Sequence, residues 1–320
     1  MRNVLLDKSQ LFGLLRCPAC KSSEIIFRDI ELICSACTSC FPITENRPIL
    51  LRNDNALFSI GDYLKKVPKK ETELVGWSRY VPSPSVNLSG DRVLKKLRSM
   101  LDANGTSNIL VVGGGRQRVW LDPLLQAVHS HCVIYSDIDS GADVNLFCDG
   151  HDLPFCDGSF DAVVTTAVLE HVLSPERVAG EIGRVLKTGG LLYSEMPFMQ
   201  QVHEGAYDFT RFTLSGHRRL FNQFAELDAG LVAGPATALV WALENFVLAF
   251  SSRPTIRKVL KAGIRFGFSW IKYFDYVLKD RHEAMDGASC TYFMGAKANM
   301  RVTDAEIIAS YVGAKHLFHA

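Results

Sequence analysis

The stretch from Ser107 to Pro197 constrains the fold of this chain most, because short apolar runs alternate there with glycines and acids. The run Asn108 to Val112 ends at three consecutive glycines, which predicts a buried parallel strand leading into a turn close to a ligand. A second apolar run, Cys132 to Tyr135, precedes Asp137, and an acid ending a second strand is the expected acceptor for ribose hydroxyls. This order predicts an α/β domain that binds a nucleoside-containing cofactor.

The three glycines, Gly113, Gly114 and Gly115, form the first part of the expected cofactor site. We expect their turn to leave backbone N–H groups free to hold the cofactor, while the carboxylate of Asp137 holds its sugar. The simpler alternative is a glycine loop beside an ordinary surface acid, because glycine-rich turns between strand and helix serve many nucleotide binders. The glycines alone therefore do not identify the cofactor.

The segment that follows resembles a known family. The run LPFCDGSFDAVVTTAVLEHV, with EIGRVLKTGGLL close behind, is similar to the class I S-adenosylmethionine (SAM) dependent methyltransferases related to the ubiquinone and menaquinone methyltransferases. The resemblance extends from about Asp91 to Pro197 and implies a doubly wound, seven-stranded Rossmann-like sheet. In that family the glycine loop surrounds the methionine part of SAM, and an Asp before the LPF motif lies near the adenine. The cofactor-binding residues that it implies are Gly113, Gly114, Gly115, Asp137, Ile138, Asp149 and Gly150.

Two positions depart from the pattern of that family. Its members usually have an Asp just before the loop, where this chain has Val111 or Val112, and a final loop glycine where it has Gln117. The missing acid removes a partner for the loop or for the SAM ammonium, and the glutamine side chain could narrow the pocket. An alternative is therefore a non-catalytic interaction protein that keeps the methyltransferase fold as a scaffold.

Capping signals and periodicity predict the surrounding helices. Ser89 or Asp91 caps a helix that continues through Leu101 with one apolar face. A second helix is expected over Glu181–Lys187, with the glycine pair after it as its stop.

Apolar segments predict the remaining strands, over Phe160–Thr165, Gly190–Met196 and Thr291–Ala298. We assign residues 89–300 to the methyltransferase domain and residues 301–320 to a C-terminal tail. A helical insertion over about 231–283 separates the last two predicted strands, and we expect the substrate to be recognised there.

The first 51 residues form a separate predicted unit, a zinc ribbon. Two C-x-x-C motifs flank a segment, Ser23 to Ile33, that alternates enough to form a β-hairpin, and this spacing suits four thiolates around Zn²⁺. A unit this short buries too little apolar surface to fold alone, so structural zinc would supply much of its folding free energy. The predicted ligands are Cys17, Cys20, Cys34 and Cys37, and Cys40 is left open as an exchangeable ligand or a packing residue.

The end of this unit, FPITENRPILL from Phe41 to Leu51, resembles the small zinc-ribbon activator proteins of tRNA methyltransferases. That resemblance implies a packing or partner surface rather than chemistry. Residues 52–88 are mixed in composition, and Pro82 and Pro84 interrupt regular structure, so we expect a linker with a short helix.

The candidate catalytic residues lie in the segment HEGAYDFTRFT, directly after the strand predicted to end at Met196. Methyl transfer from a sulfonium requires alignment of the acceptor, exclusion of water and removal of a proton, but no nucleophilic side chain. We predict His203 as the base, with Asp208 and Arg211 orienting the acceptor or the loop, and Tyr207 as a further catalytic candidate. A purely structural ion pair between the last two is equally open, and His171 in the LEHV motif is assigned a structural role.

The predicted insertion contains two unusual stretches. Leu231 to Phe250 carries a single charge, Glu244, and approaches the length that spans a bilayer, but Glu244 and Pro235 argue against a span. Residues 253–281 then combine apolar residues at helical spacing with lysines and arginines on the other face. We expect either a lid helix packed on the catalytic domain or a peripheral membrane contact.

Composition narrows the function classes. A net charge of +1 gives no global attraction to nucleic acid, the N-terminus lacks signal-peptide features, and nine cysteines point to a reducing compartment. We expect a cytoplasmic enzyme, with membrane association left open, that uses SAM and structural Zn²⁺ to methylate a small molecule, a glycan or a lipid-linked acceptor. A Tyr-Asp-x-x-Arg-Phe-Thr run like that at 207–213 occurs in methyltransferase-like proteins of bacterial cell-surface polysaccharide synthesis. The main alternative is an RNA methyltransferase that binds RNA through its zinc ribbon.

Overall fold

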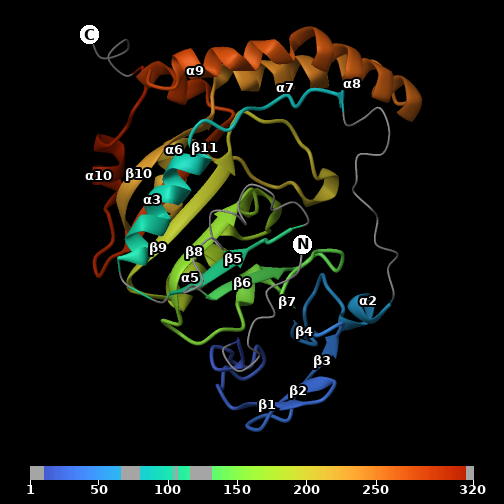
Figure 1. Cartoon of the computed structure of the whole chain (residues 1–320), viewed down its shortest axis with the longest axis vertical. Helices are drawn as coiled ribbons and strands as arrows, with labels where there is room; N and C mark the ends of the chain where they lie inside the picture. Colours follow the sequence, from blue (N-terminus) through green and yellow to red (C-terminus); the bar gives the residue numbers. More distant parts are fainter. Residues whose placement is uncertain (1–10, 66–79, 104, 106, 116–131, 315–320) are drawn as a thin grey trace.

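The computed structural model describes residues 11–65, 80–103, 105, 107–115 and 132–314. Seven strands form the sheet of the methyltransferase part: β5 (Asn108–Val112), β6 (Cys132–Asp137), β7 (Leu146–Cys148), β8 (Phe160–Thr166), β9 (Leu186–Pro197), β10 (Phe224–Ala233) and β11 (Cys290–Lys297). Their order is β7-β6-β5-β8-β9-β11-β10, and only β11 runs antiparallel to its neighbours (Figure 1). The predicted doubly wound α/β fold class is confirmed.

The side chains of β5 show why this sheet needs cover on both faces. Leu110 and Val112 lie in a core shared with α5 (Pro175–Val185), whereas Ile109 and Val111 lie in a second core shared with α3 (Gly90–Asp102). All four are buried, as a parallel strand between two helical layers requires. Packing on both faces therefore fixes the carboxyl end of β5 at the point where the strand order reverses.

Helix α3 follows its prediction, but its capping differs. Ser89 is the N-cap residue, yet its hydroxyl donates to the carbonyl of Leu231 (2.7 Å) and makes no capping bond within the helix. The amide of Asn87 replaces it, since its Oδ1 accepts from the backbone N–H of Gly90 (2.7 Å). The start of α3 is thereby tied to β10.

The helix and strand around residues 175–197 begin earlier than expected. Helix α5 starts at Pro175, a residue favoured in the first helical turn, and β9 already begins at Leu186. Leu186 pairs with Phe160 of β8, so a long-range strand contact overrides the local helical pattern of the predicted segment Glu181–Lys187. The glycine pair that we expected as a helix stop lies inside β9.

The N-terminal unit extends the same sheet. Its strands are β1 (Ile25–Arg28), β2 (Glu31–Cys34), β3 (Cys40–Thr44) and β4 (Arg47–Leu50), each antiparallel to the next. A two-residue turn with left-handed Glu45 and Asn46 joins the last two, as tight hairpins require. Strand β4 then pairs in parallel with β7, so the sheet has eleven strands among the described residues.

The second half of the chain adds a helical cap. After α6 (Leu214–Leu220), β10 is a full strand up to Ala233, so residues 231–233, expected in the helical insertion, belong to the sheet. Pairing with β11 supplies hydrogen bonds for the backbone N–H and C=O groups of these residues. The apolar sequence alone does not show this pairing. The cap itself consists of α7 (Pro235–Leu248), α8 (Pro254–Phe268), η5 (Ser269–Phe274), α9 (Asp275–Leu278) and η6 (His282–Gly287).

The cap and the N-terminal unit lie at opposite ends of the molecule (Figure 1). The short helices α2 (Ile60–Leu64) and α10 (Asp304–Ala309) complete the described elements, and α2 falls in the predicted linker. Residues 253–281 form several helical segments instead of one helix. Within the described ranges, no helix has the length and apolar character needed to cross a membrane.

Candidate functional site

A cavity opens at the carboxyl ends of β5 and β6, where a doubly wound sheet binds its ligands. Five of the seven predicted cofactor residues line it: Gly113, Asp137, Ile138, Asp149 and Gly150. Gly114 and Gly115 belong to the same turn but do not line it, and the loop position Gln117 lies outside the described residues. The cavity also takes residues from elsewhere in the chain, namely Leu57, Phe58, His171 and Tyr207.

The glycine turn shapes the cavity through the absence of side chains. Gly113 has a φ of +73°, and a Cβ there would lie 2.1 Å from a methyl carbon of Val168. The backbone N–H groups of Gly113 and Gly114 both donate to the carbonyl of Ser136 (2.9 Å each), and that of Gly115 donates to Asp137 (2.6 Å). Our expectation that these three N–H groups would be free for the cofactor is therefore wrong, because neighbouring strand β6 uses them.

Asp137 joins the two strands that form the cavity floor. Its Oδ2 accepts from Gly115, and its Oδ1 accepts from the backbone N–H groups of Ile138 (2.7 Å) and Asp139 (2.9 Å). A carboxylate offers roughly four lone-pair positions, so about one remains for a ligand hydroxyl. Burial raises the pKa of Asp137 above its ordinary value.

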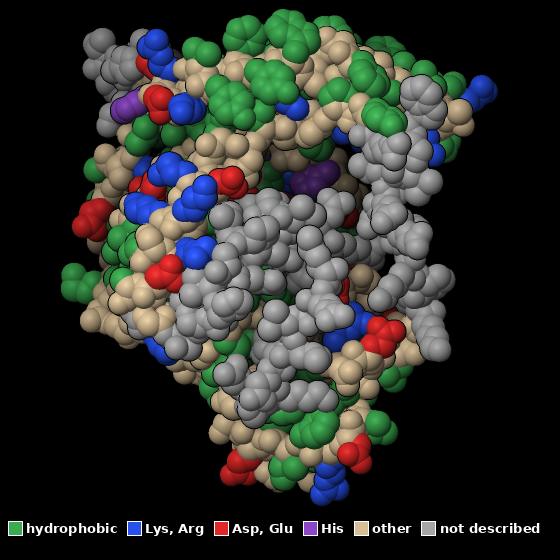
Figure 2. Space-filling view, in the orientation of Figure 1, with side chains coloured by type: hydrophobic (Ala, Val, Ile, Leu, Met, Phe, Trp, Pro, Cys, Tyr) green, Lys and Arg blue, Asp and Glu red, His purple; other side chains and the backbone are tan. Residues whose placement is uncertain are grey.

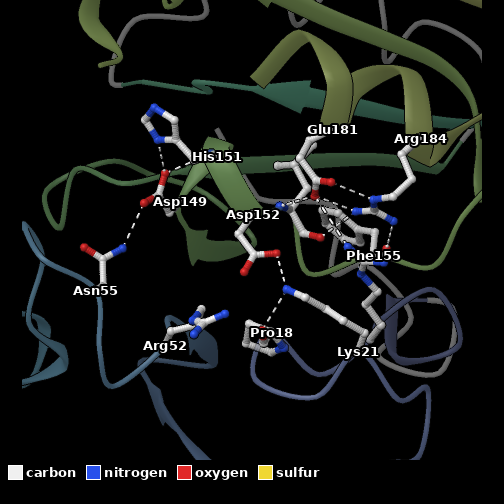
Figure 3. A network of polar contacts seen from close by, with 12 residues as sticks. Pro18, Lys21, Arg52, Asn55, Asp149, His151, Asp152, Phe155, Glu181 and Arg184 are labelled. Carbon is white, nitrogen blue, oxygen red and sulfur yellow. Dashed lines mark hydrogen bonds and ion pairs between the residues drawn. The ribbon is translucent and has the colours of Figure 1, made fainter. Parts of the chain in front are cut away.

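Asp149 also lines the cavity, and two residues hold it through three hydrogen bonds (Figure 3). Its carboxylate accepts from the backbone N–H of His151 (2.9 Å), pairs with the ring Nδ1 of the same residue (2.7 Å) and accepts from the side-chain amide of Asn55 (2.8 Å). Although burial raises its pKa, the hydrogen bonds from His151 and Asn55 lower the pKa of Asp149 below its ordinary value. This side chain is therefore a preorganised acceptor with little capacity left over.

Asn55 connects the predicted linker to the cavity. Besides its bond to Asp149, its Oδ1 accepts from the backbone N–H groups of Leu57 and Phe58 (3.0 Å each). These two side chains line the cavity, and Tyr63 of α2 donates to the carbonyl of Ile138. The segment after the N-terminal unit thus lines the cavity, which its composition did not indicate.

Polar contacts also fix the N-terminal unit against the methyltransferase sheet (Figure 3). Lys21 forms an ion pair with Asp152, and its ammonium also donates to the carbonyl of Pro18 (2.8 Å). Within the larger α/β part, Arg184 donates to the carbonyls of Phe155 (2.7 Å) and Leu153 (2.9 Å) and pairs with Glu181. These contacts surround the short loop that carries Asp149 and His151.

The four predicted metal ligands come together. The thiol sulfurs of Cys17, Cys20, Cys34 and Cys37 all lie within 4.8 Å of one another. The Cys17–Cys37 and Cys20–Cys34 sulfur pairs are 3.6 and 3.5 Å apart. Two sulfurs bound to one tetrahedral Zn²⁺ at about 2.3 Å would be separated by roughly 3.8 Å, so the donor set fits this ion.

Both C-x-x-C motifs adopt the same turn. In each, the backbone N–H four residues after the first cysteine donates to that cysteine's carbonyl, from Lys21 to Cys17 (2.8 Å) and from Thr38 to Cys34 (2.9 Å). Lys21 and Thr38 both have positive φ, which turns the chain back toward the sulfurs. Cys40 starts β3, points its thiol at the carbonyl of Thr38 and is not in the four-sulfur group.

The four predicted catalytic residues lie in the segment after β9. Two of them, Asp208 and Arg211, are bound to each other. Asp208 and Arg211 form a two-point ion pair, and Arg211 also donates to the backbone carbonyls of Gln200, Gln201 and Thr210. Hydrogen bonding by Arg211 lowers the pKa of Asp208 well below its ordinary range. This geometry is that of the structural alternative, a loop fixed by an ion pair. Tyr207 lines the cavity, and His203 contacts residues of the LEHV motif.

Sequence reasoning missed Glu170, which precedes His171 in that motif. Its carboxylate is fully buried, and burial raises its pKa to about 7. It lies 3.6 Å from Nε2 of His171 and 3.9 Å from Nε2 of His203. The signal that could have found it was the pairing of an acid with a histidine directly after a strand that ends at the cofactor. His171, which we assigned a structural role, lines the cavity.

Comparisons with known proteins agree with this architecture. A family model described as "Methyltransferase domain" matches residues 126–194. A UPF0434 protein from Nitrosococcus oceani is 43% identical over 54 residues, which make up 17% of this chain and 90% of the relative. That relative belongs to a zinc-ribbon family, in agreement with the cysteine cluster.

Solved structures with a similar fold are distant. Phosphoethanolamine N-methyltransferase 2 of Haemonchus contortus is 14% identical, with a TM-score of 0.40 over 64% of this chain and 52% of its own. The 1,6-didemethyltoxoflavin-N1-methyltransferase of Burkholderia thailandensis is 13% identical, with a TM-score of 0.38 over 66% and 80%. A chain from the complex of the Haloferax volcanii Trm112 methyltransferase activator with a methyltransferase is 15% identical, with a TM-score of 0.40 over 65% and 94%.

These similarities are too low to transfer a substrate. The family match, the order of the strands and the fused cysteine cluster nevertheless agree with one another. Residues 126–194 of the chain match the methyltransferase-domain family, and its N-terminal unit belongs to the UPF0434 family.

Proposed function

We propose that this protein transfers the methyl group of SAM to a hydroxyl of a lipid-linked glycan or related amphiphilic acceptor at an anionic membrane surface. The observation that carries the methyltransferase part is the cavity between Gly113, Asp137 and Asp149, which meets His171 and Tyr207 at its other wall. The exposed surface of the cap supports the acceptor class. The N-terminal unit would hold structural Zn²⁺ through its four cysteines.

The residues around the cavity fit SAM in kind and position. Asp137 and Asp149 each retain about one acceptor position, which suits ribose hydroxyls and an adenine amino group. Gly113 keeps the wall between β5 and Val168 open, and Phe58 and Leu57 provide apolar surface. When bound, SAM supplies an electrophilic methyl group. The chain's own task is to place an acceptor oxygen in line with that methyl and to exclude water.

An acceptor hydroxyl must also lose its proton. The basic atoms near the cavity wall are the imidazole nitrogens of His171 and His203 and the carboxylate of Glu170. Burial lowers the pKa of His171, so its ring is neutral at physiological pH and available as a base. The ion pair between Asp208 and Arg211 holds the loop that positions His203, because Asp208 accepts from the backbone N–H of His203 (2.9 Å).

The cap has a stripe of apolar side chains that are exposed and do not belong to the hydrophobic core. Ile256, Val259, Phe266 and Trp270 recur at helical spacing along α8 and the start of η5, and the last three are 68%, 61% and 56% exposed. Further exposed residues around them are Phe246, Phe250, Phe268, Tyr273, Phe274, Tyr276 and Val277. Figure 2 shows apolar side chains gathered over this end of the molecule. A contiguous exposed patch of this kind marks an interaction surface.

The charges of the cap favour an anionic membrane as the occupant. Between residues 249 and 279 the sequence has seven lysines or arginines (253, 257, 258, 261, 265, 272 and 279) and one acid, Asp275, which is buried. Arg253, Lys258 and Lys279 are exposed and have no ion-pair partner among the described residues. Cations beside exposed Trp, Tyr and Phe residues match a surface that lies in the lipid headgroup region.

Three other cations of the cap donate hydrogen bonds to groups inside the protein. Arg265 binds the buried carboxylate of Glu244 (2.6 Å), Arg257 donates to the carbonyl of Leu248 (2.6 Å) and Lys272 donates to that of Ser83 (2.6 Å). These three hold the cap together. A test of membrane binding must therefore leave them unchanged.

Binding of S-adenosylhomocysteine tests the cofactor assignment. Calorimetry on the full chain should show binding that is lost in Gly113→Val, because the new side chain would collide with Val168. Asp137→Ala should weaken binding at least about tenfold, the cost of one charge-assisted hydrogen bond. Glu176→Gln, an exposed change on α5, is the matched control. The absence of heat in the wild type would overturn the assignment and leave the non-catalytic scaffold.

Flotation with vesicles tests the surface. The wild type should bind vesicles rich in phosphatidylglycerol but not neutral ones, and Arg253→Glu with Lys258→Glu should weaken partitioning by about thirtyfold or more, since each cation contributes about 1 kcal/mol. Val259→Ser with Phe266→Ser should reduce binding at constant charge. Ile30→Ser and Arg28→Glu on β1 and its turn are matched controls. Equal binding of wild type and variants would contradict the membrane, and tight, salt-sensitive RNA binding lost in the same charge variants would replace it with RNA.

A further inference from the structure

Three side chains that the sequence did not group bring one carboxylate and two imidazoles together beside the cavity. Glu170 and His171 lie in η3 (Leu169–His171), and His203 lies in the loop after β9. Their ligand atoms all lie within 4.8 Å of one another. The two imidazole rings meet edge to face, with centroids 4.8 Å apart. Donors from two distant segments therefore converge on one point.

The carboxylate of Glu170 needs a partner that the described residues do not provide. The residue has no exposed surface, and neither carboxylate oxygen has a hydrogen-bond partner among the described residues. Arg211, a nearby cation, is already occupied by Asp208 and by backbone carbonyls. An unpaired buried carboxylate costs several kcal/mol, so such groups are normally protonated, paired or bound to a metal. The site therefore points to a bound cation.

The hydrogen bonds of the two histidines leave the right nitrogens available. Nδ1 of His171 lies 2.6 Å from the carbonyl oxygen of Tyr207, which can only accept, so this nitrogen carries the proton. Nδ1 of His203 lies 3.3 Å from the carbonyl oxygen of Gln201 and 3.5 Å from Asp208. In both rings the lone pair is then on Nε2, and both Nε2 atoms face Glu170. Metal-binding histidines are held in this way, by a carbonyl or carboxylate on the second nitrogen.

We propose that Glu170, His171 and His203 bind a divalent first-row transition-metal ion. Two donors at about 2.1 Å from one ion are separated by roughly 3.0–3.4 Å, so small side-chain rotations from the observed 3.6 and 3.9 Å suffice. Two imidazoles and one carboxylate leave coordination positions open, as in catalytic zinc and non-haem iron sites. His171 lines the cavity, so the open positions face the acceptor.

The site has a chemical use that rests on the proposed function. A divalent ion at this wall acts as a Lewis acid on an acceptor hydroxyl and favours loss of its proton to solvent. The acceptor oxygen then attacks the methyl carbon: the C–O bond forms, the C–S bond breaks and its electron pair stays on sulfur. When the ion is bound, the two histidines are its ligands and no longer serve as the base, and Asp208 is a positioning residue that orients His203.

Metal titration of the full chain tests the site without SAM or acceptor. The chain is first loaded with one equivalent of Zn²⁺, which the four thiolates prefer, and then titrated with Co²⁺. We expect a second equivalent to bind, with a visible spectrum that lacks sulfur-to-cobalt charge transfer. Because this readout needs neither cofactor nor activity, it can succeed even if the methyltransferase proposal fails, and the reverse also holds.

Variants identify the ligands. Glu170→Gln and His203→Ala should each abolish the second equivalent, and Asp208→Asn should weaken it about 10- to 100-fold through the orientation of His203. His282→Ala, an exposed histidine of the cap, should leave it unchanged. Since Glu170 is buried, thermal unfolding checks that its variant folds, and His203→Ala keeps the test valid if it does not. Binding of one equivalent only, or a second equivalent that survives both ligand variants, would overturn the proposal.

Discussion

The two additions to the methyltransferase sheet, the N-terminal ribbon and the α7–α9 cap, behave in opposite ways. The ribbon continues the sheet through the β4–β7 pairing and buries Leu32, Phe41 and Leu50 in the common core. The cap packs on Leu231 of β10 through Ala284 and Met285 of η6, and it leaves a row of aromatic residues exposed. The element that pairs strands becomes part of the common hydrophobic core, whereas the helical element, which adds no strand, keeps an exposed apolar face.

The strongest way to break this comparison is to remove a ribbon ligand. Cys34→Ser should lower the free energy of unfolding by on the order of 5 kcal/mol or more, because zinc binding supplies the folding free energy of such units. We expect a fall of more than about 10 °C in Tm and weaker S-adenosylhomocysteine binding. Cys40→Ser is the matched control. Unchanged cofactor affinity in a ribbon that has lost its metal would show that the two parts are independent.

A second change separates the cap from the sheet. The buried carboxylate of Asp275 accepts from the backbone N–H groups of Gly234, Ala236 and Thr237 (2.9–3.0 Å) and so caps α7. Asp275→Ala should cost about 2–4 kcal/mol, since it leaves buried donors unpaired. Limited proteolysis should then cut within 234–288 first, while Asp280→Ala should behave as wild type. Global unfolding without selective cleavage would mean that the cap is not a separate unit.

A pH titration tests how a buried histidine beside β9 and β11 affects the stability of the sheet. His217 is fully buried between Ser194 of β9 and Thr291 of β11, and burial lowers its pKa to about 3. The folded state therefore resists protonation that the unfolded state accepts below about pH 6.5. Its contribution to stability is full above that pH and falls by about 1.4 kcal/mol per unit as the pH decreases toward 3.

Urea unfolding at several pH values measures this slope. In His217→Asn the slope between pH 6.5 and 4 should decrease, and the ribbon metal should be followed separately because acid also releases it. An unchanged slope in the variant would show that His217 does not control acid sensitivity.

The smallest expected effect concerns the link between ribbon and cavity. Asn55→Ala removes one hydrogen bond to Asp149 and loosens the turn that carries Leu57 and Phe58. We expect the Kd for S-adenosylhomocysteine to rise about fivefold, equivalent to roughly 1 kcal/mol, with Tm nearly unchanged. Asp54→Ala, on the exposed side of the same turn, controls for local disturbance. A Kd equal to that of wild type would limit the ribbon to a structural role.

Much of the core was predictable because local patterns determine it. Asn108–Val112 and Cys132–Tyr135 read as buried strands in isolation, and Gly113 and Gly115 of the turn adopt the positive φ that glycine favours. Strand β10 was missed, and β9 was predicted too short, because their ends are defined by pairing with distant strands. The sequence predicted that the basic residues of the cap lie together on one outer face. Arg257, Arg265 and Lys272 instead donate to groups inside the protein.

The sequence by itself determined the four cysteines, the glycine turn and the acid of strand β6, because each acts through its own residue type and spacing along the chain. Only the tertiary structure decided that strand β6 uses the N–H groups of that turn and that Asn55 reaches Asp149. It also decided that His203 meets Glu170 from the end of another strand. Hydrogen bonds and metal ligands depend on distances across strands, and the fold sets these distances.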